Sequence, residues 1–199
     1  MSCKVEVKLK VDNEATLCRA IESLGYNYNR AAEGQTLMTQ NAYAKAQAEI
    51  VLADNNGSNS MASLGFKRQN DGFFSLVGDF HGVRGIDGGL SQSAFTRSIN
   101  NQYAKLRLQE TLAEMNFAIT SEEEVENKVK VEATGPNGKV IEGIIDDGQL
   151  TMESLNFHGQ GCEETMTELA TKVGEVQKVE YTDDMAPQVP HVNQVGQEG

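Results

Sequence analysis

The residues best suited to chemistry lie near position 160, where residues 156–164 read "NFHGQGCEE". This segment follows a strand-like run and opens a helix-like one, and a helix N-terminus favours the thiolate form of a cysteine. Cys162 is therefore a candidate reactive thiol, with His158 as the nearest base. Glu163 and Glu164 oppose this role because their charges repel a thiolate. A purely structural role requires no such neighbouring groups. In that role Cys162 faces inward as a small apolar residue where the strand meets the helix, and we favour this interpretation.

Metal and redox chemistry need more groups than this segment supplies. A zinc site takes three or four ligands, whereas His158 and Cys162 are two and the other histidines are remote in sequence. The segment has no second cysteine that could resolve a sulfenic acid at Cys162. The three cysteines, Cys3, Cys18 and Cys162, are odd in number and far apart. They indicate a reducing compartment rather than a disulfide framework, and we expect no metal and no cofactor.

A glycine-rich stretch is the second candidate site. Glycines allow backbone N–H groups to approach an anion closely, and the N-terminus of the following helix adds a favourable dipole. Arg84 could hold a phosphate bidentately. The stretch lacks the Gly-Lys-Ser/Thr of a P-loop and the dinucleotide-binding fingerprint, so a surface loop is the simpler interpretation. The candidate ligand residues are His81, Gly82, Arg84, Gly85, Gly88, Gly89 and Ser91.

The net charge of −12 is unevenly distributed. Residues 1–120 contain 12 basic and 12 acidic residues, whereas residues 121–199 contain 5 basic and 17 acidic residues. Such a step predicts a boundary between units. It also argues against nucleic acid as a partner, because phosphate contacts need clustered Lys and Arg. Without an apolar run of ~20 residues or a signal-peptide pattern at the N-terminus, we expect a soluble cytoplasmic protein that does not enter a membrane.

The first third of the chain predicts a strand, a helix and further strands. Residues 5–11 alternate between apolar and charged, which is typical of a half-buried strand. Asn13 can cap a helix that ends at Gly25, with Cys18 inside its apolar stripe as a core residue. Residues 41–52 have period two and predict a strand, and residues 64–68 and 73–80 predict a hairpin around Asn70-Asp71-Gly72.

The remainder predicts a long helix, an acidic connector and a ββα unit. Residues 91–117 have two apolar stripes that differ in phase, which predicts a bend or a change of packing partner. "SEEEVEN" at 121–127 is interpreted as a connector. Two strand-like runs flank a turn at 135–138, a further turn at 146–148 leads to a third run, and a helix covers 161–174.

This order predicts an α+β fold. An antiparallel sheet with helices on one face, on the split βαβ or ferredoxin-like plan, suits it, either extended by or followed by the ββα unit. The expected divisions are residues 1–134 as an α+β domain with a long second helix, 135–180 as a ββα module, and 181–199 as a disordered tail.

Several stretches resemble known families. "SLGYNYN" at 23–29, "LGFKRQNDGFFSLVGDF" at 64–80 and "INNQYAKLRLQETLAEMNF" at 99–117 resemble the family called hypothetical chloroplast reading frame thirty-five. "GKVIEGIIDDGQLTMESLNFHGQGCEETMTELATKVGEV" at 138–176 resembles domain of unknown function twenty-nine ninety-seven, with Phe157, Gly159 and Cys162 in register. The chain thus resembles a fusion of two modules. It departs from the first family where Ala104 and Lys105 follow Tyr103 in place of a Tyr-His pair.

The resemblance implies an accessory role beside a AAA+ ATPase, because members of these families are often encoded next to one. No triad or pair of catalytic carboxylates can be assembled, so we expect a non-catalytic adaptor with a protein partner and possible homo-oligomerisation. Two alternatives stay open. One is a binder of a phosphate-bearing ligand or nucleotide at residues 78–91, and the other is a thiol-redox accessory protein that acts through Cys162.

Overall fold

The structure is a computed structural model that describes residues 3–40, 45–53, 61–80, 91–125, 128–157 and 161–181. Within these ranges the chain forms three α-helices: α1 (Glu14–Ser23), α2 (Gln92–Glu114) and α3 (Gly161–Val173). The strands are β1 (Cys3–Leu9), β2 (Asn27–Arg30), β3 (Leu37–Met38), β4 (Gln47–Ala48), β5 (Ile50–Ala53), β6 (Leu64–Arg68), β7 (Phe74–Gly78), β8 (Ala118–Val125), β9 (Lys128–Thr134), β10 (Val140–Asp146), β11 (Gln149–Leu155) and β12 (Gly174–Tyr181).

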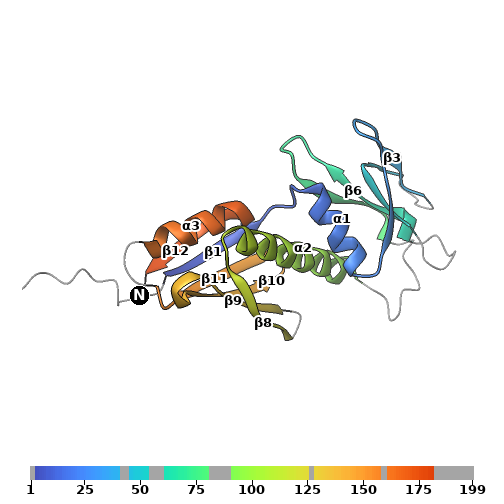
Figure 1. The fold of residues 1–199 in the computed structure, drawn as a ribbon. Coiled ribbons are helices and arrows are strands. Elements are labelled where there is room, and N and C mark those ends of the chain that lie inside the picture. The colour runs from blue at the N-terminus through green and yellow to red at the C-terminus, as the bar shows by residue number, and fades with distance from the viewer. Residues whose placement is uncertain are drawn as a thin grey trace, which may run out of the picture.

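Antiparallel strands build two larger sheets and a small one. The six-stranded sheet has the order β12-β1-β11-β10-β9-β8, the four-stranded sheet has the order β2-β5-β6-β7, and β3 pairs with β4. Figure 1 shows the two larger sheets in separate parts of the molecule, with α2 running between them. The predicted α+β class with antiparallel sheets is confirmed.

The first strand of the chain joins strands from its last third. β1 lies between β11 and β12, with Val5 opposite Met152 on one side and Val179 on the other. Since α3 connects β11 to β12 and packs over β1, this part is a split β-α-β unit (Figure 1). β2, β5, β6 and β7, which follow α1, form a different sheet from β1, whereas a single sheet was expected. The boundary at residue 135 stays a prediction, and strands from both sides of it share the six-stranded sheet.

α2 changes its packing partner halfway along. Its first half places Ile99 and Tyr103 in a core with α1 and the four-stranded sheet. Its second half places Leu108 and Leu112 in a core with α3 and the six-stranded sheet. The two apolar stripes of the sequence are thus two faces of one helix, each turned toward a different core, and the predicted change of partner is confirmed.

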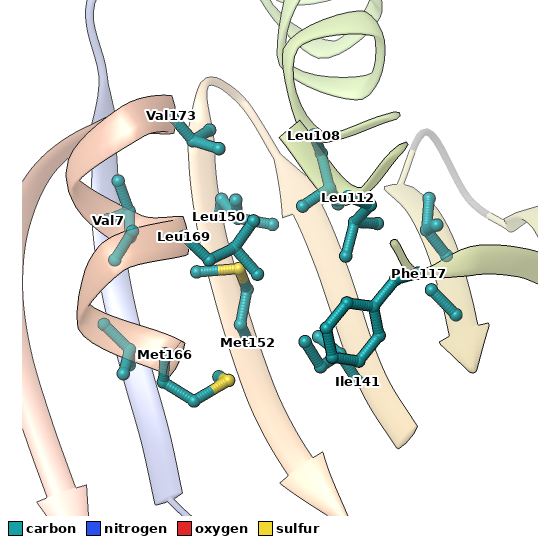
Figure 2. Close-up of a cluster of buried hydrophobic side chains, with 14 of the residues drawn as sticks. Val7, Leu108, Leu112, Phe117, Ile141, Leu150, Met152, Met166, Leu169 and Val173 are labelled. Atoms are coloured by element: carbon teal, nitrogen blue, oxygen red, sulfur yellow. The ribbon is translucent and has the colours of Figure 1, made fainter. Parts of the chain in front are cut away.

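Helices α2 and α3 cover the same face of the six-stranded sheet. Figure 2 shows Leu108 and Leu112 beside Phe117, and Leu169 of α3 beside Leu150 of the sheet. Gly143 of β10 also faces this core, where a Cβ atom would lie 3.0 Å from Leu108 Cδ2. Glycine at this position therefore lets α2 approach the sheet closely.

Helix starts and turns follow local signals. Asn13 caps α1 by accepting a hydrogen bond from the Thr16 N–H at 3.0 Å, as predicted. In the turn between β10 and β11, φ is 49° at Asp147 and 75° at Gly148. Gly72 has a φ of 87° in the turn between β6 and β7. Both turns use the left-handed region that Gly and Asp tolerate, so the predicted hairpins are confirmed.

Two segments depart from their predicted form. The acidic run interpreted as a connector over 121–127 belongs to β8 as far as Val125, because it pairs along β9; residues 126–127 lie outside the described residues. The strand predicted over 41–52 is two short strands, β4 and β5, separated at Glu49. Residues 41–44 of that segment also lie outside the described residues.

Among the described residues, no helix is both long enough and apolar enough to cross a membrane. β12 includes Tyr181, and the rest of the tail predicted from residue 181 lies outside the described residues.

Candidate functional site

The glycine-rich segment predicted to hold an anion lies mainly outside the described residues. This applies to His81, Gly82, Arg84, Gly85, Gly88 and Gly89, whereas Ser91 is described. Ser91 is the N-cap of α2, and its Oγ accepts a hydrogen bond from the Ala94 N–H at 3.2 Å. Ser91 therefore satisfies one of the free N–H groups at the start of α2.

The predicted thiol site at the start of α3 is buried. Cys162 has no exposed surface, and its Sγ lies 2.9 Å from the Oγ of Ser154 on β11. His158 lies outside the described residues. No group of three or more His, Cys, Asp or Glu side chains within the described ranges could hold a metal ion. Cys162 thus has the inward-facing position expected of a structural joint, as does the fully buried Phe157.

A second cysteine lies beside Cys162. The Oγ of Ser154 accepts a hydrogen bond from the Cys3 N–H at 2.9 Å and donates one to the Cys3 carbonyl at 3.3 Å. Cys3 and Cys162 lie in the same core, close enough for Cys162 to act on the pKa of the Cys3 thiol. The segment around Cys162 has no second cysteine, as the sequence showed, but the fold brings Cys3 close to it. Its partner comes from β1, whose pairing with β11 is not visible in any local sequence pattern.

Burial raises the pKa of the Cys3 thiol to about 11, and the neighbouring Cys162 and Glu163 add to the shift. Since the thiolate is the reactive form of cysteine, Cys3 is protonated and unreactive at neutral pH while it stays in this environment.

Tyr103 ties the crossover between β1 and α1 to α2. Its side chain is fully buried, and its hydroxyl accepts hydrogen bonds from the N–H groups of Asp12 at 3.2 Å and Asn13 at 3.0 Å. The same hydroxyl donates to Asp12 Oδ1 at 2.8 Å. From the other side, the Phe74 N–H donates to the Val11 carbonyl at 2.7 Å. The sequence revealed Tyr103 only as part of an apolar stripe, because its polar partners are distant along the chain.

A cavity of about 450 Å³ lies between this crossover, the β6–β7 hairpin and the first half of α2. Its polar lining residues are Lys10, Ser75, Gln92, Thr96 and Asn100, and its apolar ones are Leu9, Val11, Phe66, Phe73, Phe74, Leu76, Phe95 and Ile99. The Lys10 amine lies 4.7 Å from the centre of the Phe73 ring and 2.9 Å from Glu175 Oε2. Aromatic walls with a few polar groups are typical of small-molecule sites. Sequence reasoning missed this cavity, because three separate segments form it.

β8 is an exposed edge of the six-stranded sheet. All eight of its residues are exposed, and among the described strands it pairs only with β9. Glu122 forms an ion pair with Lys105 of α2 and accepts a hydrogen bond from Gln109 Nε2 at 2.8 Å. Within the described chain, Glu123 and Glu124 have no ion pair. A groove of about 180 Å³ separates this strand from α2, and Glu124 lines it.

Together these features define an α+β protein in which one helix serves two cores, with an acidic edge strand, a buried thiol pair and an aromatic cavity. The chain belongs to the family described as "Protein of unknown function (DUF1257)", whose model matches residues 20–131. The match extends from α1 to β9, so it includes the four-stranded sheet, α2 and β8. Neither the curated proteins nor the solved structures give a match to the chain.

Proposed function

We propose that the protein is a non-catalytic adaptor that holds a partner protein along the edge of β8. The observation that carries this proposal is the exposure of all eight residues of β8 at the end of the six-stranded sheet. Such an edge offers a row of backbone N–H and C=O groups to an extended segment of another chain. Ion pairing of Glu122 with Lys105 holds the strand against α2 and supports it as a docking edge.

Charge selects the partner of β8. Antiparallel pairing with a second copy would bring the Glu residues of one β8 against those of the other, which is unfavourable. The same charges protect a free edge from aggregation. An extended segment rich in Lys or Arg would instead meet Glu123 and Glu124 with opposite charge, and we assign this chemistry to the partner.

The proposal that the partner belongs to an ATPase-associated system rests on the family resemblances of residues 23–117 and 138–176. We treat the chain as a fusion of these two modules and place its partner in an ATPase-associated system. The family resemblance points to a AAA+ ATPase, and the charge of β8 points to a basic extended segment. We therefore propose a AAA+ ATPase that carries such a segment as the partner.

The partner can be identified by photo-crosslinking in the native host. A benzophenone amino acid at Ser121, an exposed position of β8, should attach to the partner, and the same group at the exposed Thr171 of α3 is the control. The proposal expects the crosslink from Ser121 to a basic segment of a protein with an ATPase domain. Crosslinks from Thr171 alone, or to proteins without such a domain, would contradict it.

Charge reversal then tests how the partner is held. The double substitution Glu123→Lys and Glu124→Lys should lower the affinity for the crosslinked protein at least ~10-fold. Glu163→Lys with Glu164→Lys is the matched control, because it makes the same charge change at exposed positions of α3. Equal losses for the two pairs would indicate a general charge effect and would argue against docking on β8.

A second candidate function is the binding of a nucleotide in the cavity beside α2. The aromatic walls of this cavity, contributed by Phe66, Phe73, Phe74 and Phe95, suit a planar base. The amine of Lys10 is the cationic group of the lining and suits a phosphate. Release of Lys10 from Glu175 would accompany binding, because the two are paired in this structure.

Native mass spectrometry with added ATP, ADP and AMP tests the nucleotide proposal. A bound nucleotide should be lost in Thr96→Trp, since Thr96 lines the cavity and a larger side chain there fills it. Ala113→Trp is the control, on an exposed position at the other end of α2. If no nucleotide binds at millimolar concentration, or if Thr96→Trp binds as well as the unaltered protein, this function is excluded.

A further inference from the structure

We propose that Cys3 and Cys162 form a reversible disulfide, which makes the contact between β1 and α3 sensitive to peroxide. The proposal is independent of partner docking on β8. Its basis is that two cysteines from opposite ends of the chain are both fully buried in one core and bonded to the same serine.

The strand register explains why the two cysteines meet. Lys4 lies opposite Glu153 in the β1–β11 pair, which brings Cys3 next to Ser154. α3 packs over β1 and places Cys162 against the hydroxyl of Ser154. Ser154 Oγ thus contacts the backbone of Cys3 and the sulfur of Cys162 at the same time. Two cysteines that share one contact residue across neighbouring elements approach the first geometric requirement of a disulfide, which is closeness without large movement of the backbone.

The third cysteine does not compete for this bond. Cys18 lies in the other core, with α1 and the four-stranded sheet. Because the two cores are separate clusters, an intramolecular disulfide in the folded protein involves Cys3 and Cys162.

Hydrogen peroxide is the oxidant that the proposal requires. One thiol attacks peroxide, its sulfur becomes a sulfenic acid, and the first water leaves. The second thiol then attacks this sulfur, the S–S bond forms, and the sulfenic oxygen leaves as a second water. Peroxide gains the two electrons that the two thiols lose, and a dithiol reductant returns the pair to its original state.

Burial controls the rate of this reaction. Neither cysteine has exposed surface, so the oxidant reaches the sulfurs when the contact between β1 and α3 opens. Oxidation is therefore slow in the folded protein and faster in low concentrations of urea that favour opening.

The disulfide would close a ring that includes nearly all of the described chain. A crosslink between distant residues restricts the unfolded chain more than the folded one. The oxidised protein should therefore melt at a higher temperature than the reduced protein, by about 5 °C or more for a chain of this size.

The experiment uses the full chain treated with hydrogen peroxide, followed by alkylation of the remaining thiols and peptide mapping. We expect a crosslinked peptide pair that contains Cys3 and Cys162, an alkylated Cys18, and a rise in melting temperature that dithiothreitol reverses. Cys18→Ala should retain both the crosslink and the rise, whereas Cys3→Ser and Cys162→Ser should lose both.

Three outcomes would overturn the proposal. The first is oxidation of Cys162 to a sulfinic acid while Cys3 stays alkylatable, because a well-placed partner resolves the sulfenic acid first. The second is a crosslink that forms only after complete unfolding. The third is a disulfide between two chains instead of within one. Peptide mapping of the unaltered protein distinguishes these outcomes even if a variant fails to fold.

Discussion

The hydroxyl of Tyr103 is a polar anchor within an apolar core. It satisfies two backbone N–H groups at the crossover that leads from the six-stranded sheet to α1, and its own proton is held by Asp12. Buried donors that lose their acceptor cost more than an average hydrogen bond contributes. The residue therefore links α2 to the crossover by polar bonds in addition to packing.

Replacing Tyr103 with Phe should lower the free energy of unfolding by about 1–3 kcal/mol, because two N–H groups lose their acceptor while the ring is kept. Urea unfolding followed by circular dichroism measures this change. Tyr26→Phe is the matched control, since the ring of Tyr26 packs against Phe95 and no hydrogen bond of its hydroxyl is found within the described residues. A loss no larger than that of the control would contradict the anchoring role.

The thiol of Cys3 should make stability depend on alkaline pH. Burial raises its pKa from 9.0 to about 11, so between these values the unfolded chain releases a proton that the folded chain keeps. The free energy of unfolding must then fall as the pH rises from 9 to 11, by about 2 kcal/mol from this group.

Urea unfolding of the reduced protein at pH 8, 9, 10 and 11 checks this dependence. Cys3→Ala should show a shallower fall over the same range, because it has no thiol to titrate. Parallel curves for the two proteins would mean that Cys3 titrates normally in the folded chain.

At the scale of single residues, local signals predicted the structure well. The cap at Asn13 needs only the neighbouring N–H groups, and the buried position of Cys18 follows from the apolar stripe of α1. The meeting of Cys3 with Cys162 had no such signal. It depends on a strand pairing between the two ends of the chain, which neither segment specifies by itself.

Among the elements, α2 carries the connection between the two cores. Ile99 and Leu108 are almost fully buried, at 2% and 1% exposure, and lie in different cores. Because one continuous helix supplies both, loss of packing in either core should weaken the other through α2.

Ile99→Ala and Leu108→Ala should each lower the free energy of unfolding by about 2–5 kcal/mol in a single cooperative transition. Thermal unfolding monitored by far-UV circular dichroism and tyrosine fluorescence checks this. Gln102→Ala, a half-buried position between them on α2, is the control and should change stability little. Two separate transitions, with each variant shifting only one, would show that the cores unfold independently.

β8 is a strand that the sequence did not predict. Its run of glutamates has low β-propensity and no alternation, so the segment is typical of a connector. It forms a strand because β9 supplies the backbone partners and Lys105 and Gln109 contact Glu122. In contrast, β6 and β7 were predicted closely, since the Asn-Asp-Gly turn between them is a property of the segment itself.

For the whole molecule, strand order was the hardest property to foresee. The alternation of β1 indicates a half-buried strand, but it does not indicate that the strand lies between β11 and β12. The excess of acidic residues after position 120 was visible in the sequence, but its partial placement on the exposed edge strand β8 was not. The cavity beside α2 likewise exists only when crossover, hairpin and helix come together.

The central claim is that a partner pairs with the edge of β8, and amide hydrogen exchange with and without the crosslinked ATPase partner tests it most directly. A strand added to this edge must protect amides of β8, whereas those of β12, at the opposite edge of the same sheet, should exchange as before. Slower exchange in β8 alone is the predicted result. Unchanged exchange in β8, with protection in β12 or α3, would contradict the account.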